Sequence, residues 1–186
     1  MRIAVLADLH GDLGALEAIL DDAAHRGAEA VFLLGDALGG SDDAALVARL
    51  GEAGVVAVRG EADEPLADAP AEVRAYAEKL PAWIQVQDGD TCLAFCHADP
   101  RSPSWQPLDG ATPEEQLQAA FEVAEADVLL VGHTHEPLAR RIGDRALLNP
   151  GRAGGGDAAR YLLVDTEGGL TAAHVRVGVG RDARRA

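Results

Sequence analysis

The sequence Val-Leu-Leu-Val-Gly-His-Thr-His at residues 128–135 is a short apolar run that leads directly into two histidines. Four other apolar runs lead in the same way to polar side chains that bind metals, at residues 4–7, 31–35, 55–58 and 92–96. Short continuous runs of this kind are typical of strands that are buried on both faces. In open α/β sheets the ligand site lies beyond the carboxyl ends of the strands. Because metal-binding side chains recur at this one end, the pattern predicts a metal centre.

The candidate ligands follow these runs closely in the chain: Asp8, His10, Asp36, Glu61, Asp63, His97, His133 and His135. Asp8 and His10 lie on one side of an extended segment, as do His133 and His135, so each pair can face a single cleft. Imidazole and carboxylate ligands without thiolate favour Mn²⁺, Fe, Co²⁺, Ni²⁺ or Zn²⁺ over Ca²⁺. Taken singly, each aspartate has an alternative role as a helix cap or turn residue, and His97 has one as a buried core residue.

Strands and helices alternate in the first half of the chain, which is typical of parallel strand pairing. One helix is expected between the first two apolar runs, and another over residues 42–53 with Ser41 as its N-cap. A later helix is expected over residues 113–125, where Thr112 and Glu115 have the spacing of a capping box.

A short helix near residues 71–80 and a hairpin over residues 83–96 are expected in the middle of the chain. Four further strands are predicted in the last quarter, at residues 138–142, 146–148, 161–165 and 170–177. These elements predict an α/β fold in which two packed sheets have helices outside them. We expect one domain that spans residues 1–186, of which residues 181–186 form a frayed tail.

The composition of the chain limits its function classes. A length of 186 residues with 48% hydrophobic residues suits one globular domain with a full core. The formal net charge of −15 argues against broad nucleic-acid binding, although a metal centre would still attract a small phosphorylated substrate. No apolar stretch approaches the ~20 residues needed to span a membrane. Asp8 comes too early for the apolar core of a signal peptide, so a cytoplasmic location is expected.

A set of short motifs follows the apolar runs: Asp8-x-His10, Gly35-Asp36, Gly60-x-x-Asp63, His97 and Gly132-His133-Thr134-His135. In content and order this set resembles the calcineurin-like metallophosphoesterases, above all their small bacterial and archaeal phosphodiesterase branch. The resemblance covers nearly the whole chain and includes the family's late Asn-Pro-Gly turn, here at residues 149–151. It implies a four-layer α/β/β/α sandwich, with two mixed sheets, and a metal-dependent phosphoesterase activity.

The resemblance also implies two divalent metal ions, with manganese expected and iron, nickel, cobalt or zinc as alternatives. By this analogy the ligands have three roles: Asp8, His10 and His135 hold the first ion, His97 and His133 hold the second, and Asp36 bridges them. Two divalent ions ~3.5–4 Å apart stabilise both the attacking and the leaving oxygen of an in-line displacement. A water bound to both ions would lose a proton near neutral pH and become the nucleophile.

The third motif departs from the family pattern. The chain has Gly-Glu-Ala-Asp at residues 60–63, where the family has Gly-Asn-His-Glu/Asp or Gly-Asn-Cys-Asp. Glu61 replaces a neutral metal ligand, and Ala62 replaces a histidine that protonates the leaving group or contacts the phosphate in many relatives. Two divalent ions, Asp8, Asp36 and a bridging hydroxide together carry a charge of +1, which a ligating Glu61 would cancel. This predicts a preference for monoanionic diesters over dianionic monoesters. The alternative is that Glu61 points into solvent and the second metal site is weak.

The expected catalytic residues are Asp36, Glu61 and Asp63, with Glu61 also a metal ligand. The expected substrate contacts are Arg59, Arg101 and Arg152, because a guanidinium pairs bidentately with phosphate oxygens. Each arginine has the alternative role of a solvated surface charge. Trp105 is expected to hold its proline-rich loop against the core, with stacking on a nucleobase as the alternative.

We therefore expect a phosphodiesterase that acts on a small phosphodiester or nucleotide. A phosphomonoesterase, including a phosphoprotein phosphatase, is the alternative within the enzyme class. A protein-binding scaffold of the same fold, similar to the retromer scaffold subunit, is the alternative outside it. Homo-oligomer formation is expected by resemblance alone.

Overall fold

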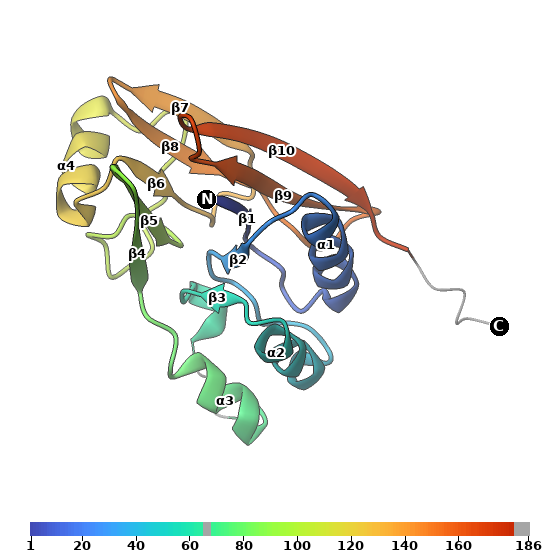
Figure 1. Cartoon of the computed structure of the whole chain (residues 1–186). Coiled ribbons are helices and arrows are strands. Elements are labelled where there is room, and N and C mark those ends of the chain that lie inside the picture. Colours follow the sequence, from blue (N-terminus) through green and yellow to red (C-terminus); the bar gives the residue numbers. More distant parts are fainter. Residues whose placement is uncertain (65–67, 181–186) are drawn as a thin grey trace.

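Two five-stranded sheets pack face to face, and helices cover the outer face of each sheet (Figure 1). The computed structural model describes residues 1–64 and 68–180. The α-helices of these residues are α1 (Leu13–His25), α2 (Asp43–Glu52), α3 (Ala71–Ala77) and α4 (Glu114–Ala124). The predicted α/β class and the four-layer α/β/β/α sandwich with two mixed sheets are therefore confirmed. The tail predicted at residues 181–186 lies outside the described residues.

The first sheet has the strand order β10-β9-β1-β2-β3. Its strands are β1 (Arg2–Leu6), β2 (Ala30–Leu33), β3 (Val56–Ala57), β9 (Ala158–Asp165) and β10 (Thr171–Gly178). β1, β2 and β3 pair in parallel, as predicted, while β9 runs antiparallel to both β1 and β10. The carboxyl ends of the three parallel strands therefore lie at one edge of the sheet, and α1, α2 and α3 pack on its outer face.

The second sheet has the strand order β4-β5-β6-β8-β7. Its strands are β4 (Trp83–Asp88), β5 (Thr91–Cys96), β6 (Val128–Leu130), β7 (Leu138–Ile142) and β8 (Arg145–Asn149). β5, β6 and β8 pair in parallel, and β4 and β7 are antiparallel edge strands. The hairpin predicted over residues 83–96 is confirmed as β4 and β5, and α4 covers the outer face of this sheet.

Two of the predicted helix caps are wrong. The N-cap of α2 is Asp42 rather than Ser41, and its carboxylate accepts a hydrogen bond from the Ala45 N–H at 3.2 Å. No capping box precedes α4, because the Thr112 hydroxyl donates to the Asp109 carboxylate at 2.9 Å within the preceding turn. At α2 an aspartate takes the role that the pattern assigned to a serine, whereas the N-cap of α4 is Pro113, which makes no side-chain capping hydrogen bond.

The core between the sheets centres on two stacked aromatic rings. The ring of Phe32 in β2 lies parallel to that of Phe95 in β5, with centroids 4.1 Å apart and an interplanar angle of 12°. Both side chains are buried among aliphatic residues from the facing surfaces of the two sheets. Because Phe32 and Phe95 come shortly before Asp36 and His97 in the chain, this contact fixes the distance between ligands that the two sheets supply.

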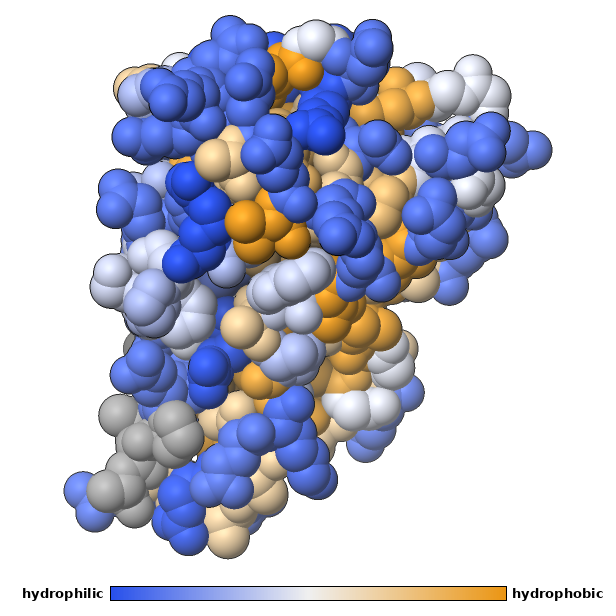
Figure 2. All heavy atoms as spheres, turned by 90° about the vertical axis from the view of Figure 1, so that its left-hand side faces the viewer, coloured by the Kyte–Doolittle hydropathy of each residue, from blue (hydrophilic) through white to orange (hydrophobic). Residues whose placement is uncertain are grey.

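The surface is mainly hydrophilic. Figure 2 shows the face that carries α4, where hydrophobic residues lie between hydrophilic ones. Across the described residues, Val56 and Val123 are the large hydrophobic side chains that are exposed. No helix within residues 1–64 and 68–180 is long and apolar enough to cross a membrane.

We expect Phe95→Ala to lower the free energy of unfolding by about 3–5 kcal/mol, because it leaves a cavity where the two sheets meet. Val123→Ala on α4 is the matched control, since its side chain is exposed and the loss should be about 0.5 kcal/mol or less. Urea unfolding followed by circular dichroism measures both values. A similar loss in the two variants would contradict the importance of the contact between the sheets.

Candidate metal centre

The backbone is strained at the strand ends. Five of the predicted ligands have positive φ angles: Asp8 (58°), His10 (48°), Asp36 (53°), His133 (68°) and His135 (62°). Trp105 and Glu125 are the other non-glycine residues with positive φ in the described chain. A positive φ at a non-glycine residue raises the conformational free energy of the chain by about 1–3 kcal/mol. Such residues gather where function requires a particular orientation of the side chain. These turns direct five side chains of the predicted metal centre towards one place.

Two glycines allow the strand ends to approach each other. A Cβ atom on Gly60 would lie 2.2 Å from Asp36 Oδ1, which is far inside contact distance. A Cβ on Gly35, which has a φ of +87°, would lie 2.7 Å from His97 Nδ1. Glycine at both positions therefore lets the first sheet bring Asp36 close to the third motif and to His97 of the second sheet.

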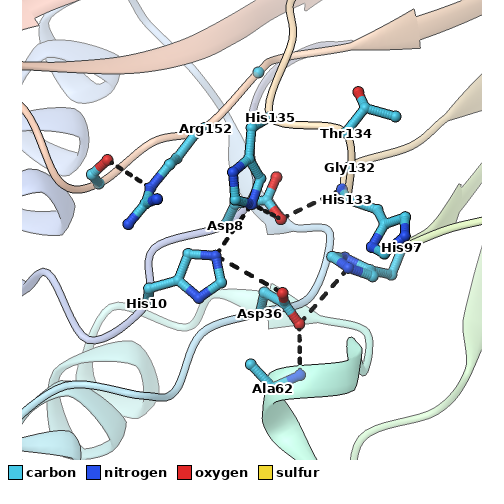
Figure 3. A network of polar contacts seen from close by, with 12 residues as sticks. Asp8, His10, Asp36, Ala62, His97, Gly132, His133, Thr134, His135 and Arg152 are labelled. Atoms are coloured by element: carbon cyan, nitrogen blue, oxygen red, sulfur yellow. Dashed lines mark hydrogen bonds and ion pairs between the residues drawn. The ribbon is translucent and has the colours of Figure 1, made fainter. Parts of the chain in front are cut away.

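Asp8, His10 and His135 form the first group of potential ligands (Figure 3). Their donor atoms lie within 4.8 Å of one another. His10 Nε2 is 3.2 Å from His135 Nε2, which in turn is 3.6 Å from Asp8 Oδ1. Asp8 is fully buried, and its Oδ1 also accepts a hydrogen bond from the His133 N–H at 3.3 Å. This group is the one that the family resemblance implies for a first ion.

Glu61, His97 and His133 form the second group. Glu61 Oε2 lies 2.7 Å from His97 Nε2, and Glu61 Oε1 lies 2.7 Å from His133 Nδ1. The carboxylate therefore points into the centre, and the alternative in which it points into solvent is wrong. His97 Nδ1 lies 2.6 Å from the Leu34 carbonyl oxygen, which leaves Nε2 to face the centre.

Asp36 lies between the two groups. Its Oδ2 is 3.8 Å from His10 Nε2 in the first group, and its Oδ1 is 3.6 Å from His97 Nε2 in the second. Oδ1 also accepts a hydrogen bond from the Ala62 N–H at 2.8 Å. One carboxylate thus presents an oxygen to each group, which is the geometry that a bridging ligand needs.

Burial and close charges shift the ionisation of these groups. Burial raises the pKa of Asp8 to about 7. Burial alone would lower the pKa of His97, but the carboxylates of Glu61, Asp36 and Asp8 outweigh it and raise this pKa to about 9. Burial alone would raise the pKa of Glu61, but its contacts with His97 and its own backbone N–H lower it to about 2. The ion-free centre therefore carries protons that a metal ion must displace.

The residues fit a metal centre. Six buried polar atoms of the described residues lack a well-aligned hydrogen bond, and four of them belong to predicted metal ligands: Asp8 Oδ2, Glu61 Oε2, His97 Nε2 and His133 Nδ1. The other two are Arg59 Nε and Tyr76 Oη. Glu61, His97 and His133 are held by their ion pairs with one another, whereas Asp8 Oδ2 has no such contact within the described residues. Buried polar atoms rarely go without a partner, and imidazole nitrogens with carboxylate oxygens are the donors that divalent transition metals prefer.

Asp63 positions other residues, and the catalytic role predicted for it stays a prediction. Its Oδ2 accepts hydrogen bonds from the N–H groups of Asp36 at 2.8 Å and Gly60 at 3.0 Å, and its Oδ1 accepts one from Leu38 at 3.0 Å. Asp63 is fully buried, and both of its oxygens are occupied by these backbone groups. It holds the loop after β2 against the third motif and does not face the ligand groups.

Asn149 supports the loop of the centre, whereas the sequence predicts it only as part of the Asn-Pro-Gly turn. Its Nδ2 donates hydrogen bonds to the Gly132 carbonyl at 2.8 Å and to Thr134 Oγ1 at 3.1 Å. Its Oδ1 accepts one from the Gly151 N–H at 2.8 Å. The buried amide thereby fixes the loop that carries His133. Asn149 ends the apolar strand β8, and this position could have identified it from the sequence as a residue of the centre.

Two predicted substrate contacts lie beside the second ligand group. Arg59 and Arg101 line one cavity of about 330 Å³ together with Trp105. Arg101 is held by a bidentate ion pair with Asp99, with N–O distances of 2.9 and 2.5 Å. The Trp105 ring meets the edge of the His97 ring at a centroid distance of 5.7 Å, so it lies at the border of the centre. Contact of these arginines with substrate stays a prediction.

Arg152 lies on the other side, beside the first ligand group (Figure 3). Its Nε donates a hydrogen bond to the Gly154 carbonyl at 3.0 Å. The pKa values of His10 and His135 are both lowered, mainly by burial and in part by the positive charge of Arg152. The charge of Arg152 therefore acts on the centre, and its contact with substrate likewise stays a prediction.

Comparison with known proteins gives consistent results. The sequence model of the calcineurin-like phosphoesterase superfamily domain matches residues 1–169. Phosphodiesterase YfcE of Escherichia coli strain K12 is 29% identical over 181 aligned residues, with 90% of this chain and 89% of YfcE covered. The structure of a metallophosphoesterase from Sphaerobacter thermophilus has a TM-score of 0.76 at 25% identity, covering 96% of this chain and 89% of that one. A Vps29 variant from Entamoeba histolytica has a TM-score of 0.62 at 19% identity, covering 96% and 100%, which shows a shared fold alone.

We expect the affinity for Mn²⁺ to rise steeply with pH. His97 is protonated below pH about 9 and Asp8 below about 7, and both must lose their protons to bind the ion. The apparent association constant should therefore gain about tenfold per pH unit at pH 8 and more below pH 7. Calorimetric titration in two buffers of different ionisation enthalpy counts the released protons.

The Glu61→Gln variant should release fewer protons at pH 8 when it binds Mn²⁺, because the substitution lowers the pKa of His97. Glu115→Gln on α4 is the control. Equal proton release in wild type and Glu61→Gln would contradict this assignment.

Asp63→Asn should destabilise the protein by about 1–3 kcal/mol, because an amide N–H₂ would face backbone N–H groups that now donate to a carboxylate. The affinity for Mn²⁺ should also fall by about 10–100-fold, since Asp36 loses its support. Urea unfolding and metal titration measure the two effects, with Asp144→Asn in an exposed turn as control. Unchanged metal affinity would show that Asp63 does not position the centre.

Proposed function

The chain belongs to the calcineurin-like phosphoesterase superfamily, and we propose that it is a metal-dependent phosphodiesterase acting on a small phosphodiester or nucleotide. The observation that carries this proposal is the position of Asp36 between two groups of three potential ligands. One carboxylate oxygen faces each group, which is suited to two adjacent ions. The name of the Escherichia coli relative, a phosphodiesterase, supports the same reaction class.

The proposed ligands of the first ion are Asp8, His10 and His135, those of the second are Glu61, His97 and His133, and Asp36 is proposed to serve both. Manganese is the proposed metal, and iron, nickel, cobalt and zinc suit the same donors. When bound, the ions supply Lewis-acid activation of water and neutralise negative charge on the phosphoryl oxygens.

The third motif, at residues 60–63, favours diester substrates because Glu61 adds negative charge to the centre. Glu61 adds a third carboxylate to those of Asp8 and Asp36, so the ligands carry a formal charge of −3 against +4 for two divalent ions. The small remaining positive charge attracts a monoanionic diester with less competition from a dianionic monoester. Ala62 contributes a backbone N–H to Asp36 and offers no side chain that protonates a leaving group. We therefore propose substrates with good leaving groups or strained cyclic diesters.

The alternative functions differ in what they require. A phosphomonoesterase, including a phosphoprotein phosphatase, needs the centre to attract a dianion, which the third carboxylate opposes. A scaffold needs no ligand set, yet the described residues contain three overlapping groups of potential ligands, the third being Asp8, Asp36 and His97. Val56 and Val123 are the exposed large hydrophobic residues of the described surface. The cytoplasmic location and homo-oligomer formation stay predictions.

Hydrolysis of bis(p-nitrophenyl) phosphate with added Mn²⁺ tests the proposal. We expect turnover that EDTA abolishes, and a kcat/KM at least about tenfold higher than for p-nitrophenyl phosphate. Glu61→Asn should shift the ratio towards the monoester because it removes one negative charge from the centre, and Glu115→Gln should leave it unchanged.

A preference of the wild type for the monoester would contradict the diesterase assignment. A ratio that Glu61→Asn leaves unchanged would show that this carboxylate does not set the preference. If no divalent metal supports turnover of either ester, the scaffold becomes the better explanation.

A further inference from the structure

A second cavity adjoins the first ligand group on the side of Arg152. It has a volume of about 400 Å³, and its wall includes His135, Arg152, Arg160, Arg176 and the segment 154–158. His135 belongs both to this wall and to the first ligand group. A molecule bound at the metal centre can therefore extend into this cavity without crossing a barrier of protein.

Two of the arginines oppose each other across neighbouring strands. Arg160 in β9 and Arg176 in β10 are directly paired in the antiparallel register. Like charges in this arrangement destabilise a sheet. The chain has 31 acidic residues against 16 basic ones. The ion pairs that arginines form within residues 1–64 and 68–180 involve Arg2, Arg26, Arg49 and Arg101, and neither Arg160 nor Arg176 is among them. Two like charges that lie side by side without an ion pair among the described residues suit a site for an external anion.

The third arginine is held in place by the glycine segment. Arg152 Nε donates to the Gly154 carbonyl, and a Cβ on Gly155 would lie 2.9 Å from the guanidinium group. Gly155 N–H donates at 2.8 Å to the carboxylate of Asp12, the N-cap of α1. The segment is thus fixed to α1, and its lack of side chains leaves room for Arg152. A guanidinium that is already oriented loses little entropy when it binds an anion.

The charge of the wall suits a dianion. Arg152, Arg160 and Arg176 contribute three positive charges and Asp157 one negative charge, which leaves a formal charge of +2. Guanidinium groups bind phosphate oxygens through paired hydrogen bonds. Resting on the function proposed above, we propose that this cavity binds a second, terminal phosphate group carried by the phosphodiester substrate. The substrate is then a diester of a phosphorylated nucleoside or a similar bisphosphate, with its scissile phosphate at the metal centre.

Two matched diesters test this proposal: thymidine 5′-(p-nitrophenyl phosphate) and the same compound with a 3′-phosphate. Wild-type protein with Mn²⁺ should show a kcat/KM about tenfold or more higher for the phosphorylated compound, as expected for hydrogen bonds between charged groups. Arg160→Gln and Arg176→Gln should each bring the ratio of the two values close to one. Arg141→Gln is the control, because it removes the same charge from an exposed position in β7.

Binding measured without metal separates this proposal from the proposed reaction. Calorimetry in EDTA should show that thymidine 3′,5′-bisphosphate binds about tenfold more tightly than thymidine 5′-phosphate, and that Arg160→Gln removes the difference. Thermal unfolding checks the fold of the variants, which lose a repulsion and should be no less stable than wild type. If neither diester is hydrolysed but the binding difference follows Arg160, the subsite stands and the diesterase proposal fails. If both diesters are hydrolysed at equal rates, or Arg160→Gln leaves the ratio unchanged, the subsite is overturned.

Discussion

The packing of the two sheets against each other holds the metal centre together, because each ligand group contains residues from both sheets. In the first group, Asp8 and His10 follow β1 of the first sheet, while His135 follows β6 of the second. In the second group, Glu61 follows β3 and His97 follows β5. Neither sheet alone can form a complete group. The stacked rings between the sheets and the glycines that allow close approach are therefore requirements of the centre as well as of the fold. A change that separates the sheets by a fraction of an ångström alters the distances between ligands that come from different sheets.

The rest of the centre converts this packing into a fixed arrangement of charge. Left-handed turns at the strand ends orient the ligands at a cost of about 1–3 kcal/mol each. Two buried groups that bind no ion themselves keep these turns in place: Asp63 accepts backbone N–H groups around Asp36, and Asn149 spans the loop that carries His133. Without a cation, burial and mutual repulsion keep protons on the ligands, as the raised pKa of Asp8 shows. Divalent ions would displace these protons and give the buried donor atoms a partner, so ion binding and stability are coupled.

Most of the fold, and the residues that come together as candidate ligands, could be predicted from the sequence, because both depend on short-range patterns. An apolar run that ends in a histidine or carboxylate identifies a buried strand and a ligand in one signal. The direction of a side chain is harder to predict, because it depends on neighbours that are distant in the sequence and close in the fold. Asp63 and Glu61 are two residues apart in one motif, yet one accepts backbone N–H groups and the other faces two histidines. The cap of α2 was missed because Ser41 and Asp42 both suit the helix start, and the capping box expected at α4 is absent because the Thr112 hydroxyl bonds to Asp109 instead. The opposition of Arg160 and Arg176 depends on strand register, which their own local sequence does not specify.

The strongly acidic composition makes the placement of positive charge near the centre informative. A net charge of −15 repels anionic substrates over the whole surface, so attraction must come from local sources. Divalent ions are one such source, and Glu61 reduces it by adding a negative ligand. The arginine wall beside His135 is another, and it lies where no ligand carboxylate offsets it. The two features are complementary: a centre with little excess charge discriminates against a dianionic phosphate at the reacting position, while the wall next to it accepts one. A substrate with a monoanionic diester at one end and a dianionic phosphate at the other matches both, and it can bind productively in one orientation only.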